Sequence, residues 1–128
     1  EAYGVKAAVK THSPTLYAEL QLEKGGRVRL PENIDERAVY VVSGQVVAAE
    51  TEITQHQMAI FDQTSKIELV AVEPTRLVII GGTPLGKRTV WWNLVSSRKD
   101  LIEQAKRDWQ EKKFPLVPEE SEFIPLPE

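Results

Sequence analysis

Residues 15–23, which read TLYAELQLE, alternate between aliphatic residues and residues that are polar or aromatic. Because successive side chains of a β-strand point to opposite faces, this alternation predicts a strand with one buried and one wet face. Further short runs rich in β-branched residues follow, with turn residues between them: RVRL, RAVYVV, QVVAA, QMAIF, KIELVAV and TRLVII. The repetition predicts an antiparallel β-sandwich or β-barrel, whose clearest hairpin is VVSGQVV around Gly44.

The pattern changes to that of a helix after Asn93. The apolar residues now share one helical face: Leu101, Ile102, Ala105 and Trp109. This spacing predicts a single amphipathic helix over residues 97–113, with Ser97 as its N-cap. Pro115 ends it, because proline cannot continue a helix.

The composition limits how many domains the chain can form. With 128 residues, 41% of them apolar, the chain can bury one sizeable core. We therefore expect a single domain over residues 1–128, with the β-barrel in residues 1–93. Residues 114–128 contain four prolines among apolar residues, and we expect them to form an extended tail.

Charge and cysteine content exclude several classes of function. The 16 basic and 19 acidic residues are interspersed and give a net charge of −3, so we expect no direct contact with nucleic acid. No apolar run approaches the ~18 residues of a membrane span, and we expect no membrane partner. The chain has no cysteine, which excludes thiolate chemistry and makes the cytoplasm the default location.

The residues that most often carry catalysis form no recognisable catalytic motif. His12 and His56 lie far apart in the sequence and belong to no H-x-H or H-E-x-x-H pair. Ser13 beside His12 lacks the G-x-S-x-G context of a nucleophile. Residues 81–87 match the glycine and lysine spacing of a phosphate loop, but the following segment reads as a strand rather than a helix. We expect no catalytic residue in this chain.

Two adjacent tryptophans, Trp91 and Trp92, stand in the segment TVWWN. In an extended strand they point to opposite faces, so that one fills a core and the other needs cover from the helix, the tail or another domain. Together with Phe123 and Ile124 of the tail they are our candidates for a domain interface. A platform for stacking a ligand is the less favoured interpretation.

Several specific motifs resemble the C-terminal half of pirin-family proteins: THSPTLY, ERAVYVVSG, WWNLVSS and EFIPLP. The resemblance covers essentially the whole chain. It implies a mostly β fold, a cupin (RmlC-like jelly-roll) β-barrel followed by one C-terminal helix and an extended tail. Pirins are bicupins, some with quercetin dioxygenase activity and others acting as nuclear transcription cofactors. The resemblance thus implies that the sequence, which begins with Glu1 rather than methionine, is the C-terminal half of a longer two-cupin protein.

The cupin metal-binding pattern can be carried onto this sequence by aligning Gly25 and Gly44 with its two glycines. Pro31 and Asn33 then occupy the positions of two histidine ligands, and Arg37 that of the glutamate. The second cupin segment, after IFDQTS, places its histidine position near Lys66. Proline has no donor atom, asparagine is a weak ligand, and the two cations repel Fe²⁺. We therefore expect no metal or other cofactor in this domain. The resemblance places iron or another divalent metal in the N-terminal cupin.

The leading hypothesis is a metal-free, non-catalytic second cupin that packs against the N-terminal cupin of the same protein and supports it. A homodimer is a further possible assembly. One alternative is a part of a quercetin 2,3-dioxygenase-type oxygenase, which would use His12 or His56 if this chain were itself active.

The other alternative is a regulatory module that binds a small anion in a pocket formed by four residues: Arg37, Asn33, Tyr40 and Lys66. A guanidinium in a partly dry barrel would bind a carboxylate or a phosphate. The simpler interpretation is that Arg37 pairs with an acid of its own loop, Glu32, Asp35 or Glu36.

Overall fold

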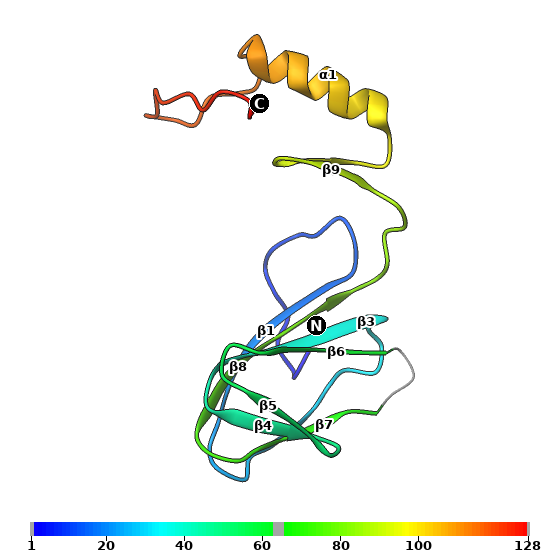
Figure 1. The fold of residues 1–128 in the computed structure, drawn as a ribbon, viewed down its shortest axis with the longest axis vertical. Helices are drawn as coiled ribbons and strands as arrows, with labels where there is room; N and C mark the ends of the chain where they lie inside the picture. The colour runs from blue at the N-terminus through cyan, green and yellow to red at the C-terminus, as the bar shows by residue number, and fades with distance from the viewer. Residues whose placement is uncertain (1, 63–65, 128) are drawn as a thin grey trace. The chain divides into compact units, whose positions relative to one another are not determined.

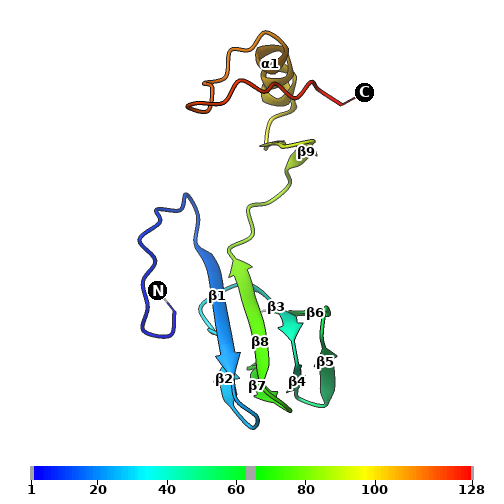
Figure 2. The ribbon, with the colours of Figure 1, turned by 90° about the vertical axis from the view of Figure 1, so that its left-hand side faces the viewer.

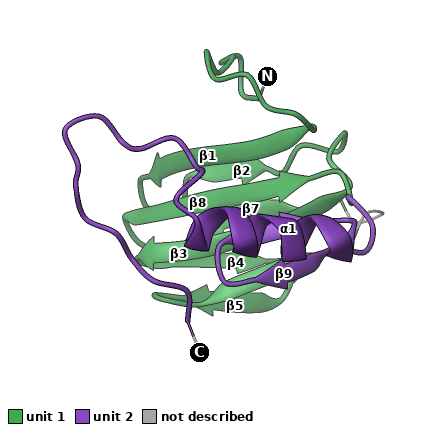
Figure 3. Cartoon of the chain, turned by 90° about the horizontal axis from the view of Figure 1, so that it is seen from above, with its two compact units in different colours: residues 1–84 green, residues 85–128 purple. Residues whose placement is uncertain are grey.

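The computed structural model describes residues 2–62 and 66–127. Glu1, with which we associated a longer parent protein, lies outside the described residues. The chain forms two compact units, residues 1–84 and residues 85–128 (Figure 3). Residues 85–93, which we expected in the barrel, belong to the second unit.

The first unit consists of two four-stranded antiparallel sheets (Figures 1 and 2). One sheet has the order β1 (Thr15–Leu22), β8 (Thr75–Gly82), β3 (Glu36–Ser43) and β6 (Met58–Phe61). The other has the order β2 (Arg27–Arg29), β7 (Glu68–Ala71), β4 (Gln45–Ala48) and β5 (Thr51–Thr54). The predicted antiparallel β architecture is confirmed.

The core lies between the two sheets and is built by the alternation that the sequence shows. On β1, Leu16 is 7% exposed and its neighbour Tyr17 is 71% exposed, as expected for a strand with one buried face. Both sheets contribute completely buried side chains: Val39, Val41, Leu77 and Ile79 from one, Val46 and Leu69 from the other. Burial of such aliphatic side chains stabilises a domain by roughly 1.5–3 kcal/mol each.

Gly44 forms the predicted turn between β3 and β4, with a φ of +83°. A Cβ atom at this position would lie 2.5 Å from the carbonyl oxygen of Pro74 and 2.5 Å from the hydroxyl of Thr75. That hydroxyl accepts a hydrogen bond of 3.0 Å from the amide of Gln45. Only glycine fits both the backbone conformation and the close approach.

The second unit contains a two-stranded sheet and a helix. β9 (Thr89–Trp91) pairs with β10 (Leu94–Ser96), so that Trp92 and Asn93 form the turn. We had not predicted β10, because a strand of three residues is too short to show a period. Trp92 has a φ of +50°, an uncommon conformation for a bulky residue.

The helix α1 (Lys99–Gln110) falls inside the predicted range and buries Ile102. Its N-cap is Arg98, which makes no side-chain cap hydrogen bond, so the prediction that Ser97 caps the helix is wrong. Among the described residues, no helix has the length and apolar content needed to cross a membrane. Residues 113–127 form neither helix nor strand. They are not extended throughout, because the amide of Glu120 donates to the carbonyl oxygen of Val117 in a turn.

Candidate functional site

Arg37 is the residue that the sequence alignment predicts at the position of a cupin's metal-binding glutamate. It is the second residue of β3, next to Gly81 on β8 and Phe61 on β6. Its side chain points between the sheets and is 1% exposed. The guanidinium donates hydrogen bonds to two backbone carbonyl oxygens, from Nη1 to Pro31 at 3.3 Å and from Nη2 to Asp62 at 2.6 Å. It therefore joins the loop before β3 to the residue that follows β6.

The other three residues that the alignment predicts at ligand positions lie in different surroundings. Pro31 is half-buried and contacts Arg37 through its carbonyl oxygen, whereas the side chain of Asn33 is exposed. Lys66 is exposed as well, with its Nζ 4.0 Å from Oε2 of Glu32. An exposed ion pair at this distance contributes little to stability.

Tyr40, which we expected to line a pocket with Arg37, lies on the other face of β3. Arg37 and Val39 point into the core, and side chains alternate along a strand, so Tyr40 points outward. Of the four predicted pocket residues, the structure leaves Asn33 and Lys66 exposed and directs Arg37 toward backbone carbonyls.

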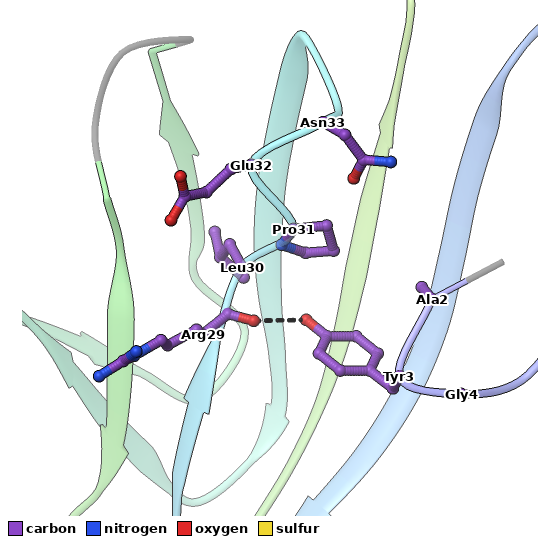
Figure 4. Close-up of a pocket in the computed structure, with 8 residues that line it drawn as sticks. All are labelled: Ala2, Tyr3, Gly4, Arg29, Leu30, Pro31, Glu32 and Asn33. Carbon is purple, nitrogen blue, oxygen red and sulfur yellow. Dashed lines mark hydrogen bonds between the residues drawn. The ribbon is translucent and has the colours of Figure 1, made fainter.

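A shallow hollow of about 510 Å³ lies beside the loop that contains Pro31 (Figure 4). Its lining comes from two segments: Ala2, Tyr3 and Gly4, and Arg29, Leu30, Pro31, Glu32 and Asn33. The Tyr3 hydroxyl donates a hydrogen bond of 2.9 Å to the carbonyl oxygen of Arg29 (dashed in Figure 4). Burial raises the pKa of the Tyr3 hydroxyl, which therefore stays protonated and a hydrogen-bond donor.

The donor atoms around Arg37 and the hollow do not fit a divalent metal. Glu32 is the only carboxylate among the residues that line the hollow. Across residues 2–62 and 66–127, no three His, Cys, Asp or Glu side chains are grouped so that they could hold a metal ion. His12 is exposed, and His56 lies exposed in the turn between β5 and β6, where its amide donates to Val41.

In the second unit, side chains that we had proposed for a domain interface gather around Trp109 of α1. The Trp92 ring lies 5.0 Å from the Trp109 ring at 89°, and the Phe123 ring lies 5.9 Å away in a stacked arrangement. The indole nitrogen of Trp109 donates to the carbonyl oxygen of Ile124 at 2.8 Å. Trp91 contacts the cluster through Trp92, with a ring separation of 6.4 Å. The sequence placed Trp109 on the apolar face of the helix and predicted that the helix, the tail or another domain would cover one of the two adjacent tryptophans. It did not identify Phe123 and Ile124 as partners of Trp109.

A second hollow, of about 270 Å³, lies between the end of α1 and the tail. Most of its lining is apolar: Trp109, Phe114, Pro115, Leu116, Val117, Phe123 and Ile124. Several of these side chains are open to solvent, including Leu116 at 76% and Val117 at 68%. Apolar residues grouped in this way are typical of a surface that another protein segment covers.

Comparisons with known proteins relate the chain to one family. A family model described as "Pirin C-terminal cupin domain" matches residues 17–115. The chain is 41% identical over 129 residues to a pirin-like protein of Caulobacter vibrioides, an alignment that covers 100% of the chain and 45% of that protein. It is 30% identical over 121 residues to pirin of Mus musculus, and this alignment covers 88% of the chain and 42% of mouse pirin. The chain spans less than half the length of both relatives.

Solved structures confirm the fold class. A crystal structure of quercetin 2,3-dioxygenase from Acinetobacter baumannii matches with a TM-score of 0.82 and 22% identity, over 99% of this chain and 44% of that chain. A second crystal structure of quercetin 2,3-dioxygenase from that organism matches with a TM-score of 0.79 and 27% identity, over 89% of this chain and 41% of that chain. The predicted cupin, a mostly β fold with one C-terminal helix, is thus confirmed.

Proposed function

The chain belongs to the pirin family, in which it corresponds to the C-terminal cupin domain, and on this premise we propose that it is a metal-free, non-catalytic cupin. Its task is to pack against a metal-binding N-terminal cupin of the same protein and to support that domain. The single observation that carries this proposal is the buried guanidinium of Arg37, bound to two backbone carbonyl oxygens.

The charge of Arg37 opposes a metal ion at this position. A divalent cation about 4 Å from a guanidinium would be repelled by roughly 8 kcal/mol at an effective dielectric constant of 20. An amide ligand such as Asn33 binds metals too weakly to offset such a repulsion. The same guanidinium joins Pro31 in the loop before β3 to Asp62 after β6. In other proteins a bound metal ion joins separate segments in this way.

The aromatic cluster of the second unit supports the packing part of the proposal. Trp92 and Phe123 remain 38% exposed, and Ile124 remains 59% exposed, although all three contact Trp109. Half-buried aromatic residues are the side chains that most often anchor protein interfaces. We therefore retain Trp91, Trp92, Phe123 and Ile124 as the proposed contact with the N-terminal cupin.

Metal content after loading tests the proposal. The purified chain is incubated with Fe²⁺, Mn²⁺, Zn²⁺ and Cu²⁺ in separate samples, desalted, and analysed for metal per chain. We expect no stoichiometric retention of any of the four ions. Retention of one ion per chain that disappears in His12→Ala or His56→Ala would contradict the proposal and support an oxygenase.

The similarity to the second quercetin 2,3-dioxygenase structure, at 27% identity, makes an oxygenase the second candidate function. In that case the reaction belongs to the whole parent protein. Oxygen consumption by this chain with added Fe²⁺ and quercetin distinguishes the candidates, because our proposal predicts none above a control without protein. The small-anion module has weaker support, since two nitrogen atoms of Arg37 already donate to backbone carbonyls.

A further inference from the structure

One sheet of the first unit carries apolar side chains on the face that points away from the core. The strand register places a row of them across all four strands, from β1 through β8 and β3 to β6: Tyr17, Ile80, Ala38 and Ile60. A second row lies beside it on β8, β3 and β6: Val78, Tyr40 and Met58. We call these residues the outer apolar face.

The outer apolar face is most open to solvent at the two edges of its sheet, whereas Ala38 in its centre is 8% exposed. On β3, Val39 is completely buried between the sheets, so that its neighbour Tyr40 points outward. The exposed fractions at the two edges of the sheet are 80% for Ile60, 71% for Tyr17 and 52% for Met58. Single exposed apolar residues are common on proteins, but a contiguous group of large ones marks a contact surface.

The other sheet of the same unit has a mainly polar outward face. Arg27 and Arg29 on β2 both pair with Glu68 on β7, at 2.8 and 3.2 Å. Glu52 and Thr54 on β5 are exposed. In a sandwich surrounded by water, outward residues are polar on both sheets. Half-buried Val47 and Val70 are the apolar residues of that outward face. The contrast between the two sheets therefore favours the outer apolar face as the contact surface.

The charged residues beside the outer apolar face neutralise each other. Glu19 lies next to Val78 in the strand register, and its Oε1 accepts a hydrogen bond of 2.7 Å from Nε of Arg76. This hydrogen bond, together with the charge of the guanidinium, lowers the pKa of the Glu19 carboxyl, so the pair stays ionised near neutral pH. The face thus suits an apolar protein surface rather than nucleic acid or a charged ligand.

We infer that the outer apolar face is a docking surface for the N-terminal cupin of the parent protein. This inference rests on the proposed function, which requires such a partner, and it adds a second contact surface to the aromatic cluster. The chain covers 45% of the Caulobacter relative, so more than half of that protein lies outside the matched segment. A domain on the same polypeptide is held near its partner at an effective concentration of about 1 mM, which favours it over a second copy of this chain.

The test uses a joined protein, in which this chain replaces its matching segment in the Caulobacter vibrioides pirin-like protein. Ile60→Glu places a charge at one edge of the proposed contact, on β6. We expect it to lower the Tm of the joined protein by about 4 °C or more, because the carboxylate would be buried without a partner. In the 128-residue chain alone, the same change should shift the Tm by less than about 1 °C, since Ile60 is 80% exposed.

Thr54→Glu is the matched control. Thr54 lies on β5, the edge strand of the polar sheet, as Ile60 lies on β6, the edge strand of the other sheet. Both side chains are exposed, and the control should change the Tm of neither protein. Tyr17→Glu, at the opposite edge of the outer apolar face, is a second variant that should repeat the effect of Ile60→Glu. If the joined protein does not fold, the remainder of the Caulobacter protein is added as a separate chain, and its binding to each variant is measured by sedimentation.

Equal Tm values for the joined protein with and without Ile60→Glu and Tyr17→Glu would overturn the inference. A second result would also overturn it: the isolated chain forms a dimer, Ile60→Glu converts that dimer to a monomer, and the Tm of the joined protein does not change. The outer apolar face would then bind a second copy of this chain. A failure of the proposed function would be seen in a different experiment. The isolated chain would then retain one metal ion per chain, both as wild type and as Ile60→Glu.

Discussion

The Nη2 atom of Arg37 lies 2.6 Å from the backbone carbonyl oxygen of Asp62, to which it donates a hydrogen bond across 25 positions of the sequence. In Arg37→Met, the carbonyls of Pro31 and Asp62 lose their guanidinium donors in a part-buried setting. We expect the free energy of unfolding in urea to fall by about 2–4 kcal/mol. Arg88→Met removes an exposed guanidinium and should change it by less than about 0.5 kcal/mol. An equally small loss in Arg37→Met would show that the guanidinium does not hold these loops.

Gly44 and Gly86 allow the backbone strain caused by an added side chain to be measured separately from its steric clash. Both residues have a positive φ, +83° and +69°, but their surroundings differ. A Cβ atom at position 44 would lie 2.5 Å from Pro74 and Thr75, whereas at position 86 it meets nothing within 4 Å. We expect Gly86→Ala to destabilise by about 1 kcal/mol through backbone strain alone. Gly44→Ala should cost at least about 2 kcal/mol more. Denaturant curves of the two variants measure the difference, and equal losses would rule out the steric effect.

The two arginines beside Glu68 predict a pH dependence of stability. Hydrogen bonds from Arg27 and then Arg29 lower the pKa of the Glu68 carboxyl below its ordinary value of 4.5. A lowered pKa in the folded state means that the contribution is fully present above pH 4.5 and is lost as the pH falls through the folded-state pKa. Wild type should therefore exceed Glu68→Gln in Tm at pH 6, and the difference should shrink at pH 3. Because all three groups are solvent-exposed, 0.5 M salt should also reduce it. Glu50→Gln, at an exposed turn, serves as the control, and a difference that grows toward pH 3 would contradict the assignment.

Trp109 should hold the tail through its ring contacts and its hydrogen bond. Trp109→Ala removes the contacts with Phe114 and Phe123 and the bond to Ile124. We expect proteolytic cleavage within residues 114–127 to become at least about tenfold faster. Trp109→Phe keeps a ring but removes the donor, and should give about a fivefold increase for the loss of one hydrogen bond. Cleavage at wild-type rates in both variants would mean that the tail does not depend on Trp109.

The sequence predicted the strands of the first unit other than β5, because a half-buried strand has a simple period. β5 (Thr51–Thr54) was missed, because its four residues include a single aliphatic side chain, Ile53. TLYAELQLE became β1 with the expected burial, and Gly44 became a turn. The helix was also predictable, since its apolar positions repeat over several turns. Its N-cap was not, because Ser97 and Arg98 are adjacent and a one-residue shift leaves the periodicity unchanged.

The candidate site was predictable only in its residue types. The cupin pattern placed Arg37 at the glutamate position, but which atoms the guanidinium contacts depends on a residue 25 positions away. The outer apolar face depends on the register of four strands, which local patterns do not determine. A signal was present in Tyr17, an aromatic residue on the otherwise polar side of TLYAELQLE.

The two hydrogen bonds of the Arg37 guanidinium join the loop before β3 to the residue after β6 without a metal ion or a disulfide. Loss of iron, a chelator or an oxidant would leave the Arg37 contacts intact, and the chain has no cysteine to oxidise. In the proposed two-cupin protein, the contacts of Arg37 would therefore be the same whether or not the partner cupin holds a metal.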